Sequence, residues 1–178
     1  DHPGVASGDF GLRIDDSAGT VTGATISVTC AAIDVNGPKR VSGVKIPLVI
    51  TKSSLTTADK AGITIYDDAN VVFSHSTVEG SSEGSGVIVK SSEAHIHDNV
   101  IGPIGGYNGI WQFGSFDTII ENNTIQNTAR EPVIIGDYHT GESGWGGLVS
   151  YPSRSHLSNN TINHVPTQQC LSERVWDK

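Results

Sequence analysis

The chain has 178 residues, and its 19 acidic and 11 basic side chains give a formal charge of −8, which disfavours nucleic acid or an anionic membrane as the main partner. Only 17% of the residues are charged, and 21 glycines recur among many Val, Ile, Asn, Ser and Thr residues, a composition typical of a globular β-rich chain. No apolar run approaches the ~20 residues of a membrane-spanning helix, so no membrane insertion is expected. Methionine is absent, even at position 1, which indicates a processed or excised piece.

The first elements in the chain are short strands, and the pair at 11–14 and 21–26 fits as an early copy of the repeat described below. Gly11-Leu-Arg-Ile14 precedes Val21-Thr-Gly-Ala-Thr-Ile26, and further strands are predicted at Val41-Ser-Gly-Val-Lys-Ile46 and Pro47-Leu-Val-Ile50. Residues 27–61 are expected to form irregular coils. This region also holds five of the eleven basic residues, which form either solvated loop charges or a polyanion-binding patch: Lys39, Arg40, Lys45, Lys52 and Lys60.

From residue 62 onward the chain repeats itself. Four segments that alternate like strands follow one another in steps of 24, 23 and 23 residues: Gly62-Ile-Thr-Ile-Tyr66, Gly86-Val-Ile-Val-Lys90, Gly109-Ile-Trp-Gln-Phe113 and Pro132-Val-Ile-Ile-Gly136. A second strand follows each of them about ten or more residues later, at 73–78, 96–101, 120–125 and 157–162. Two motifs that recur together indicate a solenoid.

The second strands share a polar position between two apolar ones. Their fourth residue is Ser76, Asn99, Asn123 or Asn160, flanked by apolar residues at the first and sixth positions. In stacked coils, an amide at a bend can bond the same group one coil away, ~4.8 Å distant, and can tolerate a left-handed backbone. We therefore expect an all-β, right-handed parallel β-helix of about six to eight coils over residues 1–165, followed at 166–178 by a tail or a short capping helix.

The glycine-headed strands followed by Ile-x-x-Asn-Asn-Thr-Ile resemble the pectate-lyase-like superfamily of right-handed parallel β-helices over roughly residues 11–165. Members include polysaccharide lyases, hydrolases, mannuronan epimerases, phage tail spikes and non-catalytic adhesins, so the resemblance implies an architecture and a choice among activities. Val89-Lys-Ser-Ser92 is similar to the strand of alginate lyases and chondroitinase B whose lysine is the base, although the position of the neighbouring arginine falls near Gln112 and only one acidic residue lies upstream. Asp137-Tyr138-His139 is similar to the Asp-Pro-His-Glu motif of mannuronan epimerases, with the proline replaced and Glu142 displaced.

The repeat phase also predicts which side chains share an outer column. One column holds Thr64, Ile88, Trp111 and Ile134, and the next holds Tyr66, Lys90, Phe113 and Gly136. An exposed Tyr66–Lys90–Phe113 column beside Trp111 would give an aromatic platform with one cation, on which sugar rings can stack. The alternative is that these rings lie under a loop or at an oligomer contact.

The last repeat carries an insertion of about 13 residues, because 37 residues rather than 24 separate Ile120 from Leu157. Its loop concentrates binding groups, namely Asp137, Tyr138, His139, Glu142 and Trp145. An inert or oligomer-packing loop is the competing interpretation. On the second strands, the column Ser74, His97, Glu121 and Ser158 predicts contacts between His97 and Glu121 and between Asp98 and Asn122, with either acid–base or merely ion-pairing roles.

The preferred function is cleavage of a uronate-containing polysaccharide by a lyase that is secreted or surface-exposed. Elimination needs a cation for the uronate carboxylate and a group that moves protons. The predicted catalytic residues are Lys90, Arg130, Tyr138 and His139, and the predicted substrate contacts are Tyr66, Trp111, Phe113, Asp137, Glu142 and Trp145. Calcium is a candidate cofactor, although no metal-ligand motif is present. The alternative is a non-catalytic glycan-binding or receptor-binding segment of a phage tail spike or adhesin, whose open ends a homo-oligomer or the rest of a longer chain would cover.

Overall fold

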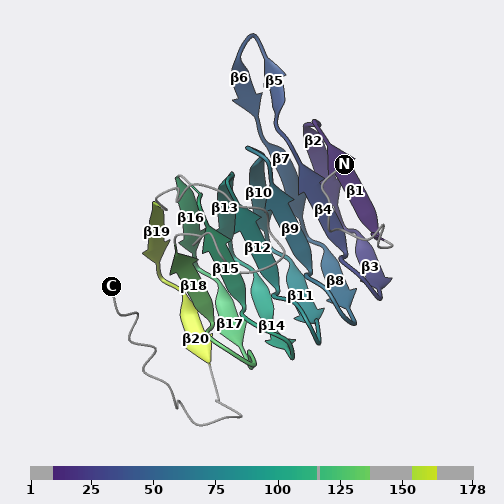
Figure 1. The fold of residues 1–178 in the computed structure, drawn as a ribbon, viewed down its shortest axis with the longest axis vertical. Helices are drawn as coiled ribbons and strands as arrows, with labels where there is room; N and C mark the ends of the chain where they lie inside the picture. Colours follow the sequence, from purple (N-terminus) through teal and green to yellow (C-terminus); the bar gives the residue numbers. More distant parts are fainter. Residues whose placement is uncertain (1–9, 116, 137–153, 164–178) are drawn as a thin grey trace, which may run out of the picture.

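The computed structural model describes residues 10–115, 117–136 and 154–163 as three parallel sheets wound from stacked coils (Figure 1). The first sheet contains β1 (Leu12–Asp15), β4 (Ile33–Asn36), β9 (Ile63–Tyr66), β12 (Val87–Lys90), β15 (Ile110–Phe113) and β18 (Val133–Gly136). The second contains β2 (Gly19–Thr22), β7 (Leu48–Thr51), β10 (Asn70–Ser74), β13 (Glu93–His97), β16 (Thr118–Glu121) and β19 (Ser155–Ser158). The third contains β3 (Thr25–Val28), β8 (Ser54–Thr57), β11 (Thr77–Gly80), β14 (Val100–Ile104), β17 (Thr124–Gln126) and β20 (Thr161–Asn163).

Each sheet has six strands, so the described chain forms six coils, at the lower end of the predicted range. The strands pair in the predicted register, with Val87 opposite both Ile63 and Ile110, and Ile110 opposite Val133. The parallel β-helix expected from the repeat is therefore confirmed. The predicted capping segment at 166–178 lies outside the described residues, and none of the described residues forms a helix that could cross a membrane.

The irregular stretch is explained by one inserted hairpin in the second coil. Residues 41–46 were predicted as a single strand, but they belong to two antiparallel strands, β5 (Lys39–Val41) and β6 (Val44–Ile46). Ser42 and Gly43 both have positive φ, 51° and 82°, as a tight two-residue hairpin turn requires. The prediction was wrong here because a local antiparallel turn competes with the solenoid period. The hairpin projects beyond the stacked coils (Figure 1).

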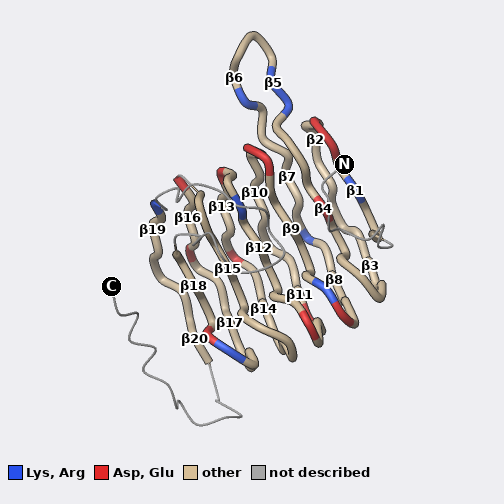
Figure 2. Tube along the Cα trace, in the orientation of Figure 1, with Lys and Arg blue, Asp and Glu red and all other residues tan. Residues whose placement is uncertain are grey.

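The basic residues of this region are largely matched by acids, which favours solvated loop charges over an open polyanion patch. Figure 2 shows basic residues on both strands of the hairpin. Lys45 is only 15% exposed and contacts Asp68 and Glu93, and Arg40 also contacts Asp68. The ion pairs hold the middle of the hairpin to the bend after β9 and to the first residue of β13, in the next two coils.

Apolar columns fill the interior of the coils. Ile50, Phe73, Ile96 and Ile120 stack in register across four coils, and none of them is exposed. Burying a side chain of this size contributes about 1.5–3 kcal/mol. The alternation of apolar and polar residues along each strand therefore determines which face turns inward. In the sixth coil the corresponding residue, Leu157, is 44% exposed, so the apolar interior is accessible at this end of the described coils.

The predicted polar ladder is present at the bend between the second and third sheets. The side-chain oxygen of Asn99 accepts a hydrogen bond from the backbone amide of Ser76 at 3.0 Å. In the same way, the side-chain oxygen of Asn123 accepts a hydrogen bond from the backbone amide of Asn99, and that of Asn160 accepts one from the backbone amide of Asn123. The ladder also reaches one coil further than predicted, because Ser76 Oγ accepts from the backbone amide of Ser53.

The left-handed backbone, however, lies one residue before the ladder. Positive φ values between 50° and 66° occur at the same place in all six described coils, at Gly23, Lys52, His75, Asp98, Asn122 and Asn159. The expected left-handed ladder residue was therefore wrong by one position. The preceding residue turns the chain, and its side chain remains outside, while the ladder side chain points into the bend to meet its partners.

Candidate functional site

The outer face of the first sheet carries a carboxyl, a phenol, two cationic groups and an indole. We call the outward side chains of its strands the first-sheet face. The predicted column is confirmed by the register, which places Thr64, Ile88, Trp111 and Ile134 opposite one another. The same register adds Asp34, directly opposite Thr64. Because Arg13 of β1 lies opposite Asp34, the column begins with two charged residues and continues with uncharged ones.

Asp34 forms a short hydrogen bond with a phenol from the next coil. Tyr66 Oη donates to Asp34 Oδ2 at 2.6 Å, and Asp34 is only 3% exposed. Burial raises the pKa of the Asp34 carboxyl above its usual range, and the hydrogen bond from Tyr66 offsets this effect only in part. Burial and the same hydrogen bond raise the pKa of the Tyr66 phenol. Tyr66 therefore stays protonated and is no simple phenolate base.

The Asp34–Tyr66 pair is suited to relay a proton. A phenol oxygen that donates its own proton to a carboxylate can accept another proton on its outer lone pair. Asp34 is a competent final acceptor because its raised pKa lowers the energetic penalty of holding a proton. The pair can thus take up and return one proton without a free phenolate.

Cationic groups lie on both sides of this pair. Arg13 is opposite Asp34 in the register, and its Nε lies 3.1 Å from Asp15 in a half-exposed ion pair. Lys90 follows Val89, whose partner is Ile65, so it occupies the position next to Tyr66 on the adjacent strand. Tyr66 and Lys90 are both half-buried, as groups at a substrate surface would be.

The predicted aromatic platform is altered at Phe113. Lys90 does pair with Phe113, but Phe113 is 4% exposed and its ring centroid lies 5.0 Å from that of half-buried Trp111. The expectation of an exposed Phe113 was wrong, because a large apolar ring gains more from packing beside Trp111 than from exposure. Gln112 points inward and is fully buried, so no polar group stands at the outer position compared above with a lyase arginine.

Of the remaining predicted site residues, Arg130 is described, and it does not lie on this face. Arg130 lies in the bend before β18, where its guanidinium stacks 4.4 Å from the ring centroid of Tyr107. Lys90 instead is the last residue of β12, so it lies at the carboxyl ends of the first-sheet strands, two coils earlier than Arg130, which lies at their amino ends. The five predicted loop residues lie outside the described residues: Asp137, Tyr138, His139, Glu142 and Trp145.

On the second sheet, the predicted column is present but its contacts differ. His97 pairs with both Ser74 and Glu121 in the register. Glu121 Oε1 nevertheless contacts His95 Nε2 at 2.8 Å, and His97 Nδ1 contacts Asp98 at 2.7 Å. The predicted His97–Glu121 contact was wrong because long side chains lean along the strand to diagonal neighbours.

Within the described ranges, one group of at least three His, Cys, Asp or Glu side chains can share a metal ion, namely His75, His97 and Asp98. Calcium prefers six to eight oxygen ligands, so a group with two imidazoles does not suit it. The expectation of calcium therefore stays a prediction.

Asp34 and Arg13 were missed by the sequence reasoning. The segment Ala32-Ile-Asp-Val-Asn36 is a copy of Gly62-Ile-Thr-Ile-Tyr66, but the inserted hairpin stretches the step between Ile33 and Ile63 to 30 residues. Aligning the two segments by their alternation rather than by a constant period would have placed Asp34 in the Thr64 column.

Comparisons with known proteins agree with the architecture. A family model described as the right handed beta helix region matches residues 10–171. No curated protein matches the sequence.

Solved structures with the same fold include three alginate-modifying enzymes. The A-module of mannuronan C-5 epimerase AlgE6 from Azotobacter vinelandii has 16% identity and a TM-score of 0.61 over 86% of this chain and 42% of its own. A double mutant of the periplasmic alginate epimerase AlgG has 14% identity and a TM-score of 0.62, covering 88% and 48%. The A-module of AlgE4 from A. vinelandii has 16% identity and a TM-score of 0.57, covering 89% and 56%. The chain thus spans about half the length of these structures.

Proposed function

Because this chain belongs to the right-handed β-helix family, we propose that its first-sheet face binds a uronate-containing polysaccharide and removes the proton at C5 of a uronate ring. The observation that carries this proposal is the hydrogen bond between half-buried Tyr66 and buried Asp34 on that face, next to Lys90. The similar structures act on alginate or mannuronan, as their names state, which supports the same class of substrate. An outside location, extracellular or surface-exposed, fits a polymer of this kind.

Substrate binding would use the exposed part of Trp111 and the charge of Lys90. A sugar ring stacks its C–H face on an indole while its hydroxyls stay hydrated. Lys90 would pair with the uronate carboxylate and stabilise the negative charge that develops there when the C5 proton leaves. In this proposal Lys90, rather than Arg130 from the predicted catalytic set, neutralises the uronate carboxylate.

Proton removal would use the relay described above. Tyr66 Oη takes the C5 proton while its own proton passes to Asp34. The electron pair from C5 then forms the C4–C5 double bond as the C4–O4 bond breaks, and Asp34 returns the proton through Tyr66 to the leaving oxygen. One proton carrier on one side of the ring suffices for this elimination, so the described face favours a lyase.

Epimerisation is the second candidate, and the alginate epimerases of the same fold favour it. It begins with the same proton removal, but a second group then protonates C5 from the opposite side and no bond to O4 breaks. Tyr138 and His139 stay the proposed carriers for that step, with Asp137, Glu142 and Trp145 as proposed substrate contacts. A non-catalytic glycan-binding segment is the third reading, and the experiment below distinguishes it.

Exchange of the C5 hydrogen in D₂O tests the proposal for both reactions. The full chain is incubated with polymannuronate, alginate, pectate and chondroitin, and proton NMR follows C5–H loss, inversion and the vinyl proton left by elimination. Wild type should exchange C5–H on at least one polymer, and Tyr66→Phe should slow exchange by about 100-fold or more. Tyr107→Phe, which removes a phenol on the exposed bend, is the matched control and should behave as wild type.

The products decide between the candidates. A vinyl proton indicates a lyase, and inversion at C5 without it indicates an epimerase. Binding without any exchange would support the non-catalytic reading and refute the proposal, and full activity in Tyr66→Phe would refute the assigned relay.

A further inference from the structure

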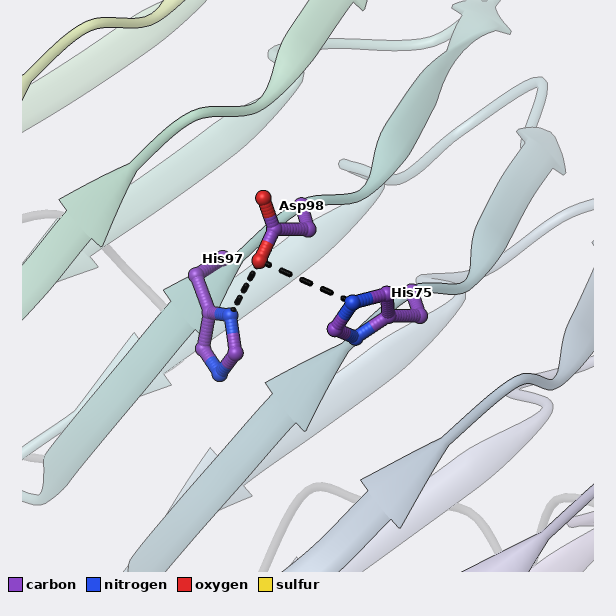
Figure 3. Close-up of side chains that lie close together, drawn as sticks. All are labelled: His75, His97 and Asp98. Atoms are coloured by element: carbon purple, nitrogen blue, oxygen red, sulfur yellow. Dashed lines mark hydrogen bonds and ion pairs between the residues drawn. The ribbon is translucent and has the colours of Figure 1, made fainter.

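A second group of functional side chains lies on a different surface, at the bend that follows the second sheet. His97 ends β13 and Asp98 follows it, while His75 follows β10 in the preceding coil (Figure 3). His75 and Asp98 occupy equivalent positions in adjacent coils, each with the left-handed backbone of that bend, at φ values of 50° and 56°. The solenoid therefore holds these side chains next to each other through its backbone pairing.

The three side chains point their ligand atoms at a common point. Asp98 Oδ2 lies 2.7 Å from His97 Nδ1 and 3.8 Å from His75 Nε2, and all three atoms lie within 4.8 Å of one another. Figure 3 shows the carboxylate placed between the two rings. Ligands at about 2.1 Å from a tetrahedral ion are about 3.4 Å apart, so modest side-chain rotation brings the three atoms to binding distance.

We propose that His75, His97 and Asp98 bind one late first-row divalent metal ion, of which Zn²⁺ is the representative. Two imidazoles and one carboxylate are ligands that suit Zn²⁺, Ni²⁺ and Cu²⁺, whereas Ca²⁺ and Mg²⁺ require oxygen. The side chains of His75, His97 and Asp98 are 57%, 20% and 40% exposed. An ion can therefore enter from solvent and keep water at its open positions.

The charges around the site are mixed. Glu121 lies one coil further along and contacts His95, whose ring centroid is 4.3 Å from that of His97. Exposed Lys52 lies one coil earlier at the same bend position as His75. Its flexible cation can swing away from an ion, while Glu121 adds a negative charge one coil away.

The bound ion would join two coils. His75 belongs to the third coil, and His97 and Asp98 belong to the fourth, so the ion links neighbours that are otherwise held by backbone hydrogen bonds and packing. Because the unfolded chain does not hold these residues together, binding stabilises the folded state. The site lies on other strands than the Asp34–Tyr66 pair, and the inference does not depend on the proposed function.

The test replaces each ligand by a residue type that occurs at the equivalent position in another coil. Asn122 and Asn159 occupy the bend position of His75 and Asp98, so His75→Asn and Asp98→Asn preserve the backbone preference. Ser74 and Ser158 share the column of His97, which makes His97→Ser the third variant. His156→Val is the matched control, because Val72 shares its column and His156 is an exposed imidazole outside the group.

Zn²⁺ binding to the full chain is measured by isothermal titration calorimetry, and the thermal midpoint is followed with and without Zn²⁺. Each of the three ligand variants should weaken Zn²⁺ binding by at least about tenfold and lose the Zn²⁺-dependent rise in midpoint, whereas His156→Val keeps both. Co²⁺ should give the visible absorption of a nitrogen-ligated ion in wild type and lose it in His75→Asn. Unchanged Zn²⁺ affinity in His75→Asn and His97→Ser, or no binding to wild type at millimolar Zn²⁺, would overturn the proposal.

Discussion

Replacing Asn123 by alanine tests how much the polar ladder stabilises the solenoid. Asn123 is 1% exposed, and its Oδ1 accepts from the backbone amide and from Nδ2 of Asn99, at 3.1 and 3.0 Å. Its Nδ2 donates to Asn160 Oδ1 and to the carbonyl of Ile96, at 3.0 and 2.9 Å. One side chain therefore makes four hydrogen bonds that join three coils.

The expected magnitude follows from the groups left behind. Alanine leaves the buried amide of Asn99 without its partner, which costs about 1–3 kcal/mol, and removes further bonds worth about 1 kcal/mol each. The sum is a loss of about 4–6 kcal/mol in the free energy of unfolding. For a chain of this size, that loss lowers the thermal midpoint by about 8–24 °C.

Asn123→Ser is the matched control, because serine occupies the same ladder position at Ser76 and accepts the amide of Ser53 there at 3.0 Å. A serine hydroxyl can satisfy the amide of Asn99, so this variant should retain about half of the stability that alanine loses. Chemical denaturation followed by circular dichroism measures both variants. A loss below 1 kcal/mol in Asn123→Ala, or equal losses in the two variants, would refute the reasoning about the buried amide.

Three further changes test other parts of the fold. Gly86→Ala should lower the free energy of unfolding by about 1–3 kcal/mol, because its new methyl would lie 2.7 Å from an isoleucine methyl and 2.8 Å from a carbonyl oxygen. Gly136→Ala is the control and should be neutral, because a methyl there would have no atom within 4 Å apart from its chain neighbours. Lys45→Ala removes the contacts that hold the hairpin to its two carboxylate partners, so trypsin should cleave faster after Arg40, and an unchanged cleavage rate would contradict this. Asp34→Asn should be more stable than wild type at neutral pH. The pKa of the Asp34 carboxyl is raised in the folded state, so wild type loses stability as pH rises from about 4 through that pKa. Chemical denaturation across pH should therefore show that the gain in the variant becomes smaller on acidification. A constant difference between the two proteins from pH 3 to 7 would contradict it.

The regular part of the fold could be predicted because each coil repeats the same two constraints. The alternation within 62–66, 86–90 and 109–113 determines which side chains face inward, and the polar position before Thr or Val determines the bend. These constraints act between residues some 23 apart, so the sequence carries them as a period. Where no insertion interrupts it, the register of the first and second sheets follows from that period.

The hairpin and the side-chain contacts could not be predicted in the same way. The turn at Ser42-Gly43 is a local signal inside an apolar run. Because the inserted hairpin lengthens this coil, the constant period could not align Asp34 with Thr64. Register gives Cα partners, but the rotamer determines that Glu121 contacts His95 rather than His97. Outer columns thus define which groups are neighbours, and only the structure decides which of them touch.

The contrast between inner and outer columns gives Asp34 its significance. The third to sixth coils all have an uncharged residue at that position, so the fold does not require a carboxyl there. These residues are Thr64, Ile88, Trp111 and Ile134. A carboxyl that is 3% exposed and has a raised pKa destabilises the folded state at neutral pH, unlike the ladder amides, whose hydrogen bonds are all satisfied. Perturbed and costly ionisable groups concentrate where chemistry requires them. The loss of stability at Asp34, together with the short hydrogen bond from Tyr66, is therefore the physical reason why we propose the first-sheet face as the reaction site.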